Sequence, residues 1–120
     1  MVVDDDQAVR ALAASVLEEA GYTVELAENG IHAIERLREL GQAVSLILLD
    51  LTMPELGGAE AAPELRRIQP DIPIVAMSGY GDAEVAERFS GAHIDDYLPK
   101  PFGPDQLAAK VRNVLTSVAD

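Results

Sequence analysis

The sequence contains no cysteine and no tryptophan, and aromatic residues make up only 4% of its 120 residues. Without cysteine, the chain has no disulfide framework, no thiol nucleophile and no cysteine-ligated metal. The scarcity of aromatic side chains argues against stacking platforms for single-stranded nucleic acid. Any chemistry of this chain must therefore come from other polar groups.

Basic residues are also few. Lysine and arginine number 9 against 21 aspartates and glutamates, which gives a net charge of −12 at pH 7. Binding nucleic acid or an anionic membrane needs a basic surface, so we expect neither; a basic partner or a bound cation suits the charge. No apolar run reaches the roughly 18 residues needed to span a bilayer, and no signal peptide is recognisable at the start. We therefore expect no membrane insertion and a cytoplasmic location.

The length and the 48% hydrophobic content predict one domain over residues 1–120, with a buried core. Short apolar runs alternate with longer amphipathic segments, which predicts an α/β fold with one parallel sheet and helices on both faces. Pro63 predicts that the third helix is kinked or begins late. The predicted strands are Met1–Val3, Tyr22–Ala27, Val44–Leu49, Ile72–Met77 and Ile94–Leu98. The predicted helices are Gln7–Ala20, a segment from Asn29 or Gly30 to Leu40, a segment ending near Ile68, Ala83–Phe89 and Pro104–Val118.

Polar side chains follow four of these five strands directly. In open parallel sheets, ligands bind beyond the carboxyl ends of the strands, so side chains at these ends converge even when they are far apart in sequence. We therefore expect acids, one hydroxyl and one ammonium group to meet at one edge of the sheet. These residues are Asp4, Asp5 and Asp6 after the first strand, Asp50 after the third, Ser78 after the fourth and Lys100 after the fifth.

The chemistry of such a cluster points to a cation and a phosphoryl group. Carboxylates a few ångströms apart cannot all stay ionised without a counterion, and Mg²⁺ prefers oxygen ligands and shares its shell with phosphate. Lys100 can hold one phosphoryl oxygen and Ser78 can donate a hydrogen bond to another. Asp50 is the candidate nucleophile, and attack of its carboxylate on phosphorus gives an aspartyl phosphate.

Four segments of the chain resemble the receiver domain of two-component response regulators, in the order and spacing of that family. The stretch from Asp50 through Tyr80 to Phe89 is most similar to receivers attached to hybrid sensor histidine kinases. The resemblance implies a five-stranded parallel sheet, doubly wound as (βα)5, with the flavodoxin-like strand order 2-1-3-4-5. The four segments are Val2–Asp6, Leu48–Pro54 together with Gly58, Met77–Tyr80 and Leu98–Phe102.

The resemblance also implies the metal site and the phosphoacceptor. Asp50 matches the phosphoacceptor, which also binds the metal. Asp5 matches the acidic ligand of Mg²⁺, and Asp4 lies beside it as an outer-sphere or alternative ligand. Thr52 takes the position whose backbone carbonyl completes the metal shell.

Further residues match the parts of the family that respond to phosphorylation. Lys100 matches the phosphoryl-binding lysine, and its bond to Pro101 is expected to be cis. Ser78 matches the hydroxyl switch residue, and Tyr97 matches the aromatic that turns inward when the hydroxyl moves. We expect His32 and His93 to be ordinary surface histidines.

The favoured hypothesis is a phosphorelay switch. A histidine kinase or a histidine phosphotransfer protein donates the phosphoryl group to Asp50, and a downstream effector or an attached kinase core responds to the changed binding face. Such a chain catalyses its own phosphorylation and slow dephosphorylation, but is not an enzyme for a separate substrate. Two alternatives stay open: a phosphohydrolase with Asp4 as nucleophile and Asp6 as acid, and a receiver-like docking domain that never takes phosphate.

Overall fold

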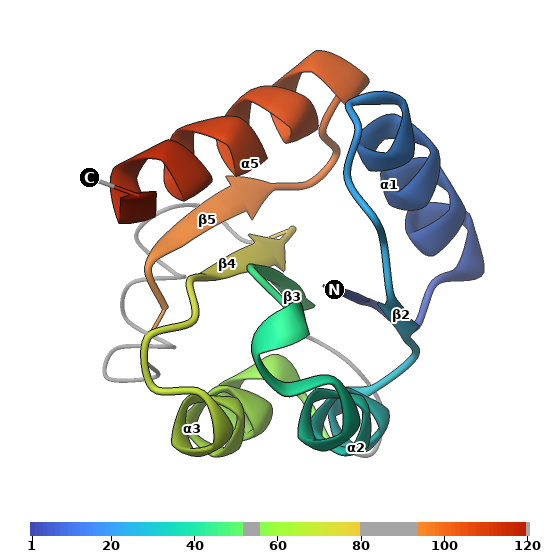
Figure 1. The fold of residues 1–120 in the computed structure, drawn as a ribbon. Coiled ribbons are helices and arrows are strands. Elements are labelled where there is room, and N and C mark those ends of the chain that lie inside the picture. Colours follow the sequence, from blue (N-terminus) through green and yellow to red (C-terminus); the bar gives the residue numbers. More distant parts are fainter. Residues whose placement is uncertain (52–55, 80–93, 120) are drawn as a thin grey trace.

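The structure is a computed structural model that describes residues 1–51, 56–79 and 94–119. Its strands form one five-stranded parallel sheet with the order β2-β1-β3-β4-β5 (Figure 1), which confirms the predicted fold class and strand order. The strands are β1 (Val2–Val3), β2 (Leu26–Ala27), β3 (Ile47–Asp50), β4 (Ile74–Ser78) and β5 (Asp96–Pro99). The helices are α1 (Gln7–Glu19), α2 (Gly30–Leu40), the 3₁₀ helix η1 (Gly41–Ala43), α3 (Gly58–Ile68) and α5 (Pro104–Ala119). The predicted helix Ala83–Phe89 lies outside the described residues.

Helices cover both faces of the sheet, α1 and α5 on one face and α2 and α3 on the other (Figure 1). Successive side chains of a strand point to opposite faces, so a strand between two helical layers must be apolar throughout. In β3, Ile47 and Leu49 pack with the core under α2 and α3, whereas Leu48 packs with the core under α1 and α5. All three are fully buried, and each contributes about 2 kcal/mol of hydrophobic stabilisation.

Every strand is shorter than the sequence pattern predicts, and the second and third differ most in where they begin. The predicted strand Tyr22–Ala27 is reduced to Leu26–Ala27, because β2 lies at the edge of the sheet and pairs only with the two residues of β1. The third strand begins at Ile47 rather than Val44. The 3₁₀ turn before it ends with the Val44 N–H donating to the Gly41 carbonyl (3.2 Å), which keeps Val44 out of the ladder.

The helix ends follow local side-chain chemistry. Asp6 caps α1 by accepting a hydrogen bond from the Ala8 N–H (2.8 Å), and Asn29 caps α2 by accepting one from the His32 N–H (2.9 Å). Gly21 follows the C-cap Ala20 of α1 with a φ of 98°, a left-handed conformation that glycine adopts readily after a helix. Of the two outcomes that Pro63 predicts, a kink or a late start, the late start does not occur, because α3 begins at Gly58 and continues through Pro63.

Within the described ranges, no helix combines the length and the apolar character that crossing a bilayer requires.

Candidate functional site

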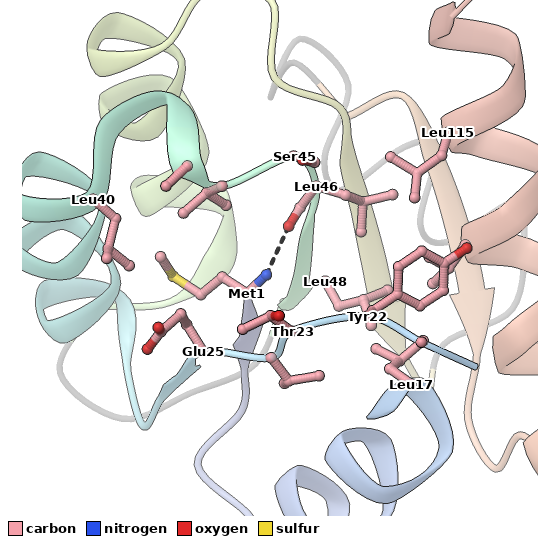
Figure 2. A pocket seen from close by; sticks show the side chains of 15 residues that line it. Met1, Leu17, Tyr22, Thr23, Glu25, Leu40, Ser45, Leu46, Leu48 and Leu115 are labelled. Carbon is pink, nitrogen blue, oxygen red and sulfur yellow. Dashed lines mark hydrogen bonds between the residues drawn. The ribbon is translucent and has the colours of Figure 1, made fainter. Parts of the chain in front are cut away.

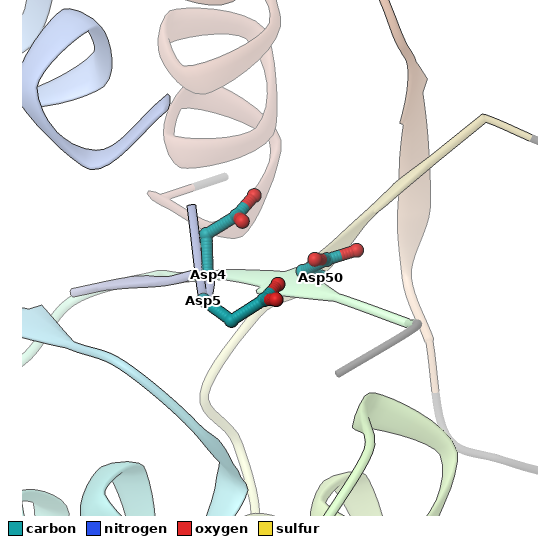
Figure 3. A group of neighbouring side chains, drawn as sticks. All are labelled: Asp4, Asp5 and Asp50. Atoms are coloured by element: carbon teal, nitrogen blue, oxygen red, sulfur yellow. The ribbon is translucent and has the colours of Figure 1, made fainter. Parts of the chain in front are cut away.

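Three carboxylates meet at the carboxyl end of the sheet. Asp4 and Asp5 follow β1, and Asp50 ends β3, the strand that pairs with β1. Each offers one oxygen, and these oxygens all lie within 4.8 Å of one another (Figure 3). Asp4 and Asp50 are buried, whereas Asp5 is exposed. The predicted convergence of acids from separate strands is therefore confirmed for these three residues.

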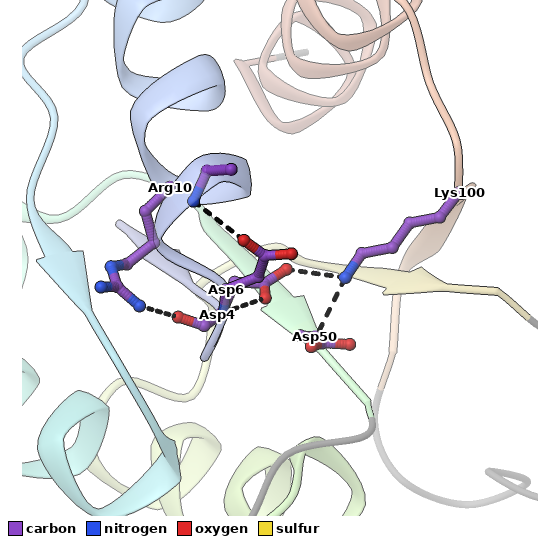
Figure 4. Close-up of polar contacts among 6 residues, drawn as sticks. Asp4, Asp6, Arg10, Asp50 and Lys100 are labelled. Carbon is purple, nitrogen blue, oxygen red and sulfur yellow. Dashed lines mark hydrogen bonds and ion pairs between the residues drawn. The ribbon is translucent and has the colours of Figure 1, made fainter.

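Lys100 brings the ammonium group to the same place. Its Nζ lies 2.7 Å from Oδ2 of Asp4 and 3.5 Å from Oδ2 of Asp50 (Figure 4). The Lys100 backbone N–H donates to the carbonyl of Ser78 (2.7 Å), which ties the end of β5 to the end of β4. The peptide bond between Lys100 and Pro101 is cis, as the resemblance implied.

Asp4 can be buried because its polar atoms have partners. Its Oδ1 accepts a hydrogen bond from the Asp6 N–H (2.9 Å), and its Oδ2 accepts one from Lys100. The Asp4 carbonyl accepts a hydrogen bond from Nη1 of Arg10 (2.7 Å). A fully buried carboxylate needs such compensation, because its desolvation is otherwise costly.

These contacts disfavour the phosphohydrolase hypothesis. The proposed nucleophile, Asp4, is 0% exposed and uses both carboxylate oxygens in hydrogen bonds. The proposed acid, Asp6, accepts a hydrogen bond at the N-terminus of α1. Both residues therefore serve the local structure, whereas Asp50 ends β3 and belongs to the carboxylate cluster.

The formal charge of the cluster suits a divalent cation. Three carboxylates against one ammonium group leave two negative charges among oxygen atoms that lie within 4.8 Å. Oxygen-rich sites of this charge are typical of hard divalent metals. The residues present therefore fit a metal, with the exposed Asp5 on the solvent side of the group.

The pKa of Lys100 is raised above its ordinary value of 10.5. Burial lowers this pKa, but the hydrogen bond with Asp4 and the negative charges of Asp50 and Asp4 together outweigh the effect of burial. The charged lysine thus stabilises the folded state.

We expect this stabilisation to be lost at high pH. A raised folded-state pKa contributes stability that is fully present below the unfolded value of 10.5 and is lost as pH rises through the folded value. The free energy of unfolding, measured by urea titration from about pH 9 upward, should fall less steeply for Lys100→Met than for the wild type. The Lys110→Met control should show the same fall of the unfolding free energy with pH as the wild type. The same pH dependence in all three proteins would contradict the stabilising role of the Lys100 charge.

The predicted switch residues, Ser78 and Tyr97, lie on β4 and β5. Ser78 is the last residue of β4 and is buried, one position beyond Met77, which pairs with Asp50. Tyr97 lies on β5, half-buried and paired with Ala76. Ser78 therefore lies at the same end of the sheet as the carboxylates.

Some predictions concern residues outside the described part of the chain, namely Thr52 and His93. His32 is half-buried on α2, and its Nδ1 accepts a hydrogen bond from the Glu28 N–H (3.3 Å). Sequence reasoning missed Arg10, which holds the Asp4 carbonyl. Its place one helical turn after the cap Asp6 is the signal that could have identified it.

A separate pocket of about 390 Å³, with both apolar and polar lining residues, lies at the opposite end of the sheet (Figure 2). Leu17, Tyr22, Leu48 and Leu115 contribute to its lining, and the Met1 amino group donates to the Leu46 carbonyl beside it (2.8 Å). It shares no residue with the carboxylate cluster and lies at the starts of the strands rather than their ends.

Comparisons with known proteins agree with the geometry. The family model described as response regulator receiver domain matches residues 1–112. The sensor kinase CckA of Brucella abortus is 37% identical over 115 residues, and the response regulator MprA of Mycobacterium ulcerans is 41% identical over 117 residues. Each alignment covers 96% of this chain, which spans 12% of the length of CckA and 49% of that of MprA. The crystal structure of a CheY-like receiver domain protein from Methanospirillum hungatei superimposes with a TM-score of 0.88 at 26% identity, covering 98% of this chain and 93% of the other.

Proposed function

This chain belongs to the family of response regulator receiver domains, and on that premise we propose that Asp50 is its phosphoacceptor. Receiver domains are the switch modules of two-component systems. The observation that carries the assignment to Asp50 is the cluster itself, in which the Asp50 carboxylate lies within 4.8 Å of two other acids and 3.5 Å from the Lys100 ammonium.

Mg²⁺ is the cation we propose for the cluster. Asp5 and Asp50 would bind it directly, the family resemblance assigns a further ligand to the carbonyl of Thr52, and Asp4 would act through water. The burial of Asp4 and its bond to Lys100 support an outer-sphere role, and the exposure of Asp5 supports a direct one. When bound, the metal neutralises charge on the transferring phosphoryl oxygens.

The reaction of the chain's own residues follows from this arrangement. An oxygen of Asp50 attacks the phosphorus of a phosphohistidine, the phosphorus–nitrogen bond breaks, and the imidazole leaves with the electron pair and takes up a proton. Lys100 pairs with a phosphoryl oxygen, which places a positive charge where negative charge develops. The chain thus promotes its own phosphorylation and, with water as the attacking group, its own slow dephosphorylation.

The new charge on Asp50 is the switch signal. Ser78 moves to donate a hydrogen bond to the phosphoryl group, and Tyr97 on β5 changes its position with it. The phosphoryl group shifts the balance between two states that exist beforehand. A partner then recognises the altered face.

The partners follow from the family and its relatives. We propose that residues 1–120 act as one receiver domain in the cytoplasm, phosphorylated by a histidine kinase or a histidine phosphotransfer protein. A downstream effector or an attached kinase core then responds to the phosphorylated receiver domain. Relatives of both kinds exist, since MprA is a response regulator and CckA is a sensor kinase.

The decisive experiment is phosphorylation of the purified chain. Incubated with acetyl phosphate and Mg²⁺, the wild type should gain the mass of one phosphoryl group, and with a chelator it should gain none. Asp5→Asn should need about 10 to 100 times more Mg²⁺ for half-maximal uptake, because it loses a metal ligand. Intact-protein mass spectrometry over a Mg²⁺ series measures both.

The matched control for this experiment is Asp6→Asn, which removes an adjacent exposed charge but keeps a side chain that caps α1. Its Mg²⁺ requirement should stay near that of the wild type. Equal requirements for the Asp5→Asn and wild-type chains would contradict the role of Asp5. Uptake by the wild type in the presence of chelator would contradict the role of the metal.

A further inference from the structure

Asp5 is the member of the carboxylate cluster whose direction depends on the backbone that carries it. Asp4 and Asp50 both contact the Lys100 ammonium, at 2.7 Å and 3.5 Å. The exposed Asp5 side chain has no hydrogen bond or ion pair with any residue that the structure describes, yet its carboxylate points toward that of Asp50 (Figure 3). The turn between β1 and α1 must therefore hold this carboxylate in the cluster.

This turn is held by the Asp4 side chain and by Arg10. Oδ1 of Asp4 accepts a hydrogen bond from the Asp6 N–H (2.9 Å), which makes Asp5 the middle residue of a tight turn. The Asp4 carbonyl belongs to the peptide group that joins Asp4 to Asp5, and it accepts a hydrogen bond from Nη1 of Arg10 (2.7 Å). Arg10 approaches from the side opposite Lys100 (Figure 4). Arg10 thus holds the peptide group that leads directly into Asp5.

Helix α1 places Arg10 for this contact. Arg10 is the fourth residue of α1, and its backbone N–H donates to the carbonyl of Asp6 (3.0 Å). Helical side chains lean toward the N-terminus of their helix, which directs the guanidinium back to the turn before α1. A cation at the start of a helix is disfavoured by the helix dipole. The hydrogen bond to the Asp4 carbonyl therefore explains an arginine here that helix formation alone does not.

Removing the guanidinium would leave the Asp4 carbonyl without a donor. Asp4 is 0% exposed, so water does not reach this oxygen while the turn keeps its shape. Within the described part of the chain, no other group donates to it. A buried carbonyl without a hydrogen bond is costly, and rotation of the peptide group toward water relieves that cost. The same rotation turns Asp5 away from Asp50, because Asp4 and Asp5 share the peptide group.

We infer that Arg10 is a positioning residue for the cation site, holding the Asp4 carbonyl so that the Asp5 carboxylate faces Asp50. This inference rests on the proposed function, in which Asp5 and Asp50 bind Mg²⁺. The path from the guanidinium to Asp5 consists of one hydrogen bond and one peptide group. Asp50 keeps its place without Arg10, because it ends β3 and contacts Lys100.

Titration of the purified chain with Mg²⁺, followed by NMR without a phosphodonor, measures the effect directly. Arg10→Met fills a similar space without the charge or the donor, and we expect it to bind Mg²⁺ about tenfold more weakly. Loss of the charge alone predicts the opposite, because removing a positive group beside the carboxylates should strengthen the binding of a cation. Tighter or unchanged binding by Arg10→Met would overturn the inference.

Arg10→Lys separates the geometry of the side chain from its charge. The variant keeps the positive charge, but the lysine side chain is shorter and lacks the planar fork of arginine. We expect it also to bind Mg²⁺ about tenfold more weakly. If Arg10→Lys bound Mg²⁺ as tightly as the wild type, the inference would be wrong, even in the case that Arg10→Met does not fold.

Two control variants exclude effects of distant charge and of stability. Arg38→Met makes the same substitution at an exposed site in the last turn of α2, at the end of the sheet away from the cluster, and should change Mg²⁺ affinity less than about twofold. Ala13→Gly removes a buried methyl group from α1, so it should lower the melting temperature and leave Mg²⁺ affinity unchanged. Equal losses of affinity in Ala13→Gly and Arg10→Met would contradict a positioning role.

The double variant Arg10→Met with Asp5→Asn tests the path through Asp5. If Arg10 acts by directing the Asp5 carboxylate, its removal should weaken Mg²⁺ binding less than about twofold once that carboxylate is gone. A further tenfold loss in the Asp5→Asn chain would mean that Arg10 acts on the site by another route, and the inference would fail.

The outcomes also separate this inference from the proposed function. If the wild type binds Mg²⁺ and gains a phosphoryl group while both Arg10 variants keep the wild-type affinity, the role of Arg10 is wrong and the phosphoacceptor assignment stands. If the Arg10 variants bind Mg²⁺ more weakly but the wild type gains no phosphoryl group, the proposed function fails and Arg10 remains a positioning residue of a cation site. If the wild type binds no Mg²⁺, the metal assignment and the role of Arg10 both fail.

Discussion

Replacing Asp50 with asparagine is expected to abolish phosphorylation of the chain. The amide has nearly the shape of the carboxylate, so the end of β3 keeps its place beside β1 and β4. It lacks the anionic oxygen that attacks phosphorus, and no other group takes over the position 3.5 Å from the Lys100 ammonium. Intact mass after incubation with acetyl phosphate and Mg²⁺ should show one added phosphoryl group for the wild type and none for the variant.

The control for Asp50→Asn is Asp71→Asn. Asp71 is exposed and lies just before β4, at the end of the sheet away from the carboxylate cluster. This variant should gain the same mass as the wild type. If Asp50→Asn gained a phosphoryl group at the wild-type rate, the phosphoacceptor would be another residue, and peptide mapping would identify it.

The sequence alone predicts the fold well because the pattern of β3 is unambiguous. A short run of apolar residues that ends in an aspartate is typical of a strand buried on both faces. Val2 and Val3 at the start of the chain fit the same pattern. Once parallel strands are inferred, their carboxyl ends lie at one edge of the sheet, and the strand order that the resemblance implies places Asp4 and Asp5 beside Asp50.

What the sequence does not predict depends on pairing and close approach between distant segments. The length of β2 is set by its neighbour β1, with which it pairs over two residues. The residues Tyr22–Ala27 themselves do not indicate how long β1 is, so the length of β2 could not be predicted from them. The close contact of Gly30 depends on the carbonyl of Leu56, which lies outside α2 and is far away in the sequence. A glycine at a helix start is explained locally as a helix boundary, so its close contact is visible only in three dimensions.

The environments of the three aspartates after β1 could not be predicted from the sequence either. Three successive aspartates after a strand are chemically alike in sequence, yet the structure gives each a different environment. Asp4 is buried against Lys100, Asp5 is exposed within the cluster, and Asp6 caps α1. The difference arises because the chain turns from strand to helix over these residues, which points their side chains in different directions.

Replacing Lys100 with methionine is expected to lower stability and phosphoryl transfer while strengthening metal binding. Asp4 is fully buried, so removing its ammonium partner leaves an uncompensated charge and should cost about 3 kcal/mol in the free energy of unfolding without Mg²⁺. The rate of phosphorylation should fall about a hundredfold, because a positive group that stabilises the transferring oxygens is lost.

The control for Lys100→Met is Lys110→Met. Lys110 pairs with Asp96 at 3.1 Å, but the two side chains are 30% and 37% exposed, so this pair should contribute less than about 1 kcal/mol. Urea titrations of both variants without metal give the comparison, and the phosphorylation rate of Lys110→Met should equal that of the wild type.

Opposite effects on metal binding and on transfer are what distinguish Lys100 from a residue that only supports the fold. Without the ammonium group, three carboxylates face the cation instead of three carboxylates and a competing positive charge, so Mg²⁺ should bind more tightly to the variant. A merely unfolded or distorted site would lose metal affinity and transfer together. Weaker Mg²⁺ binding by Lys100→Met, measured by calorimetry on the folded variant, would therefore contradict the arrangement in which Lys100 and the metal share the charge of Asp4 and Asp50.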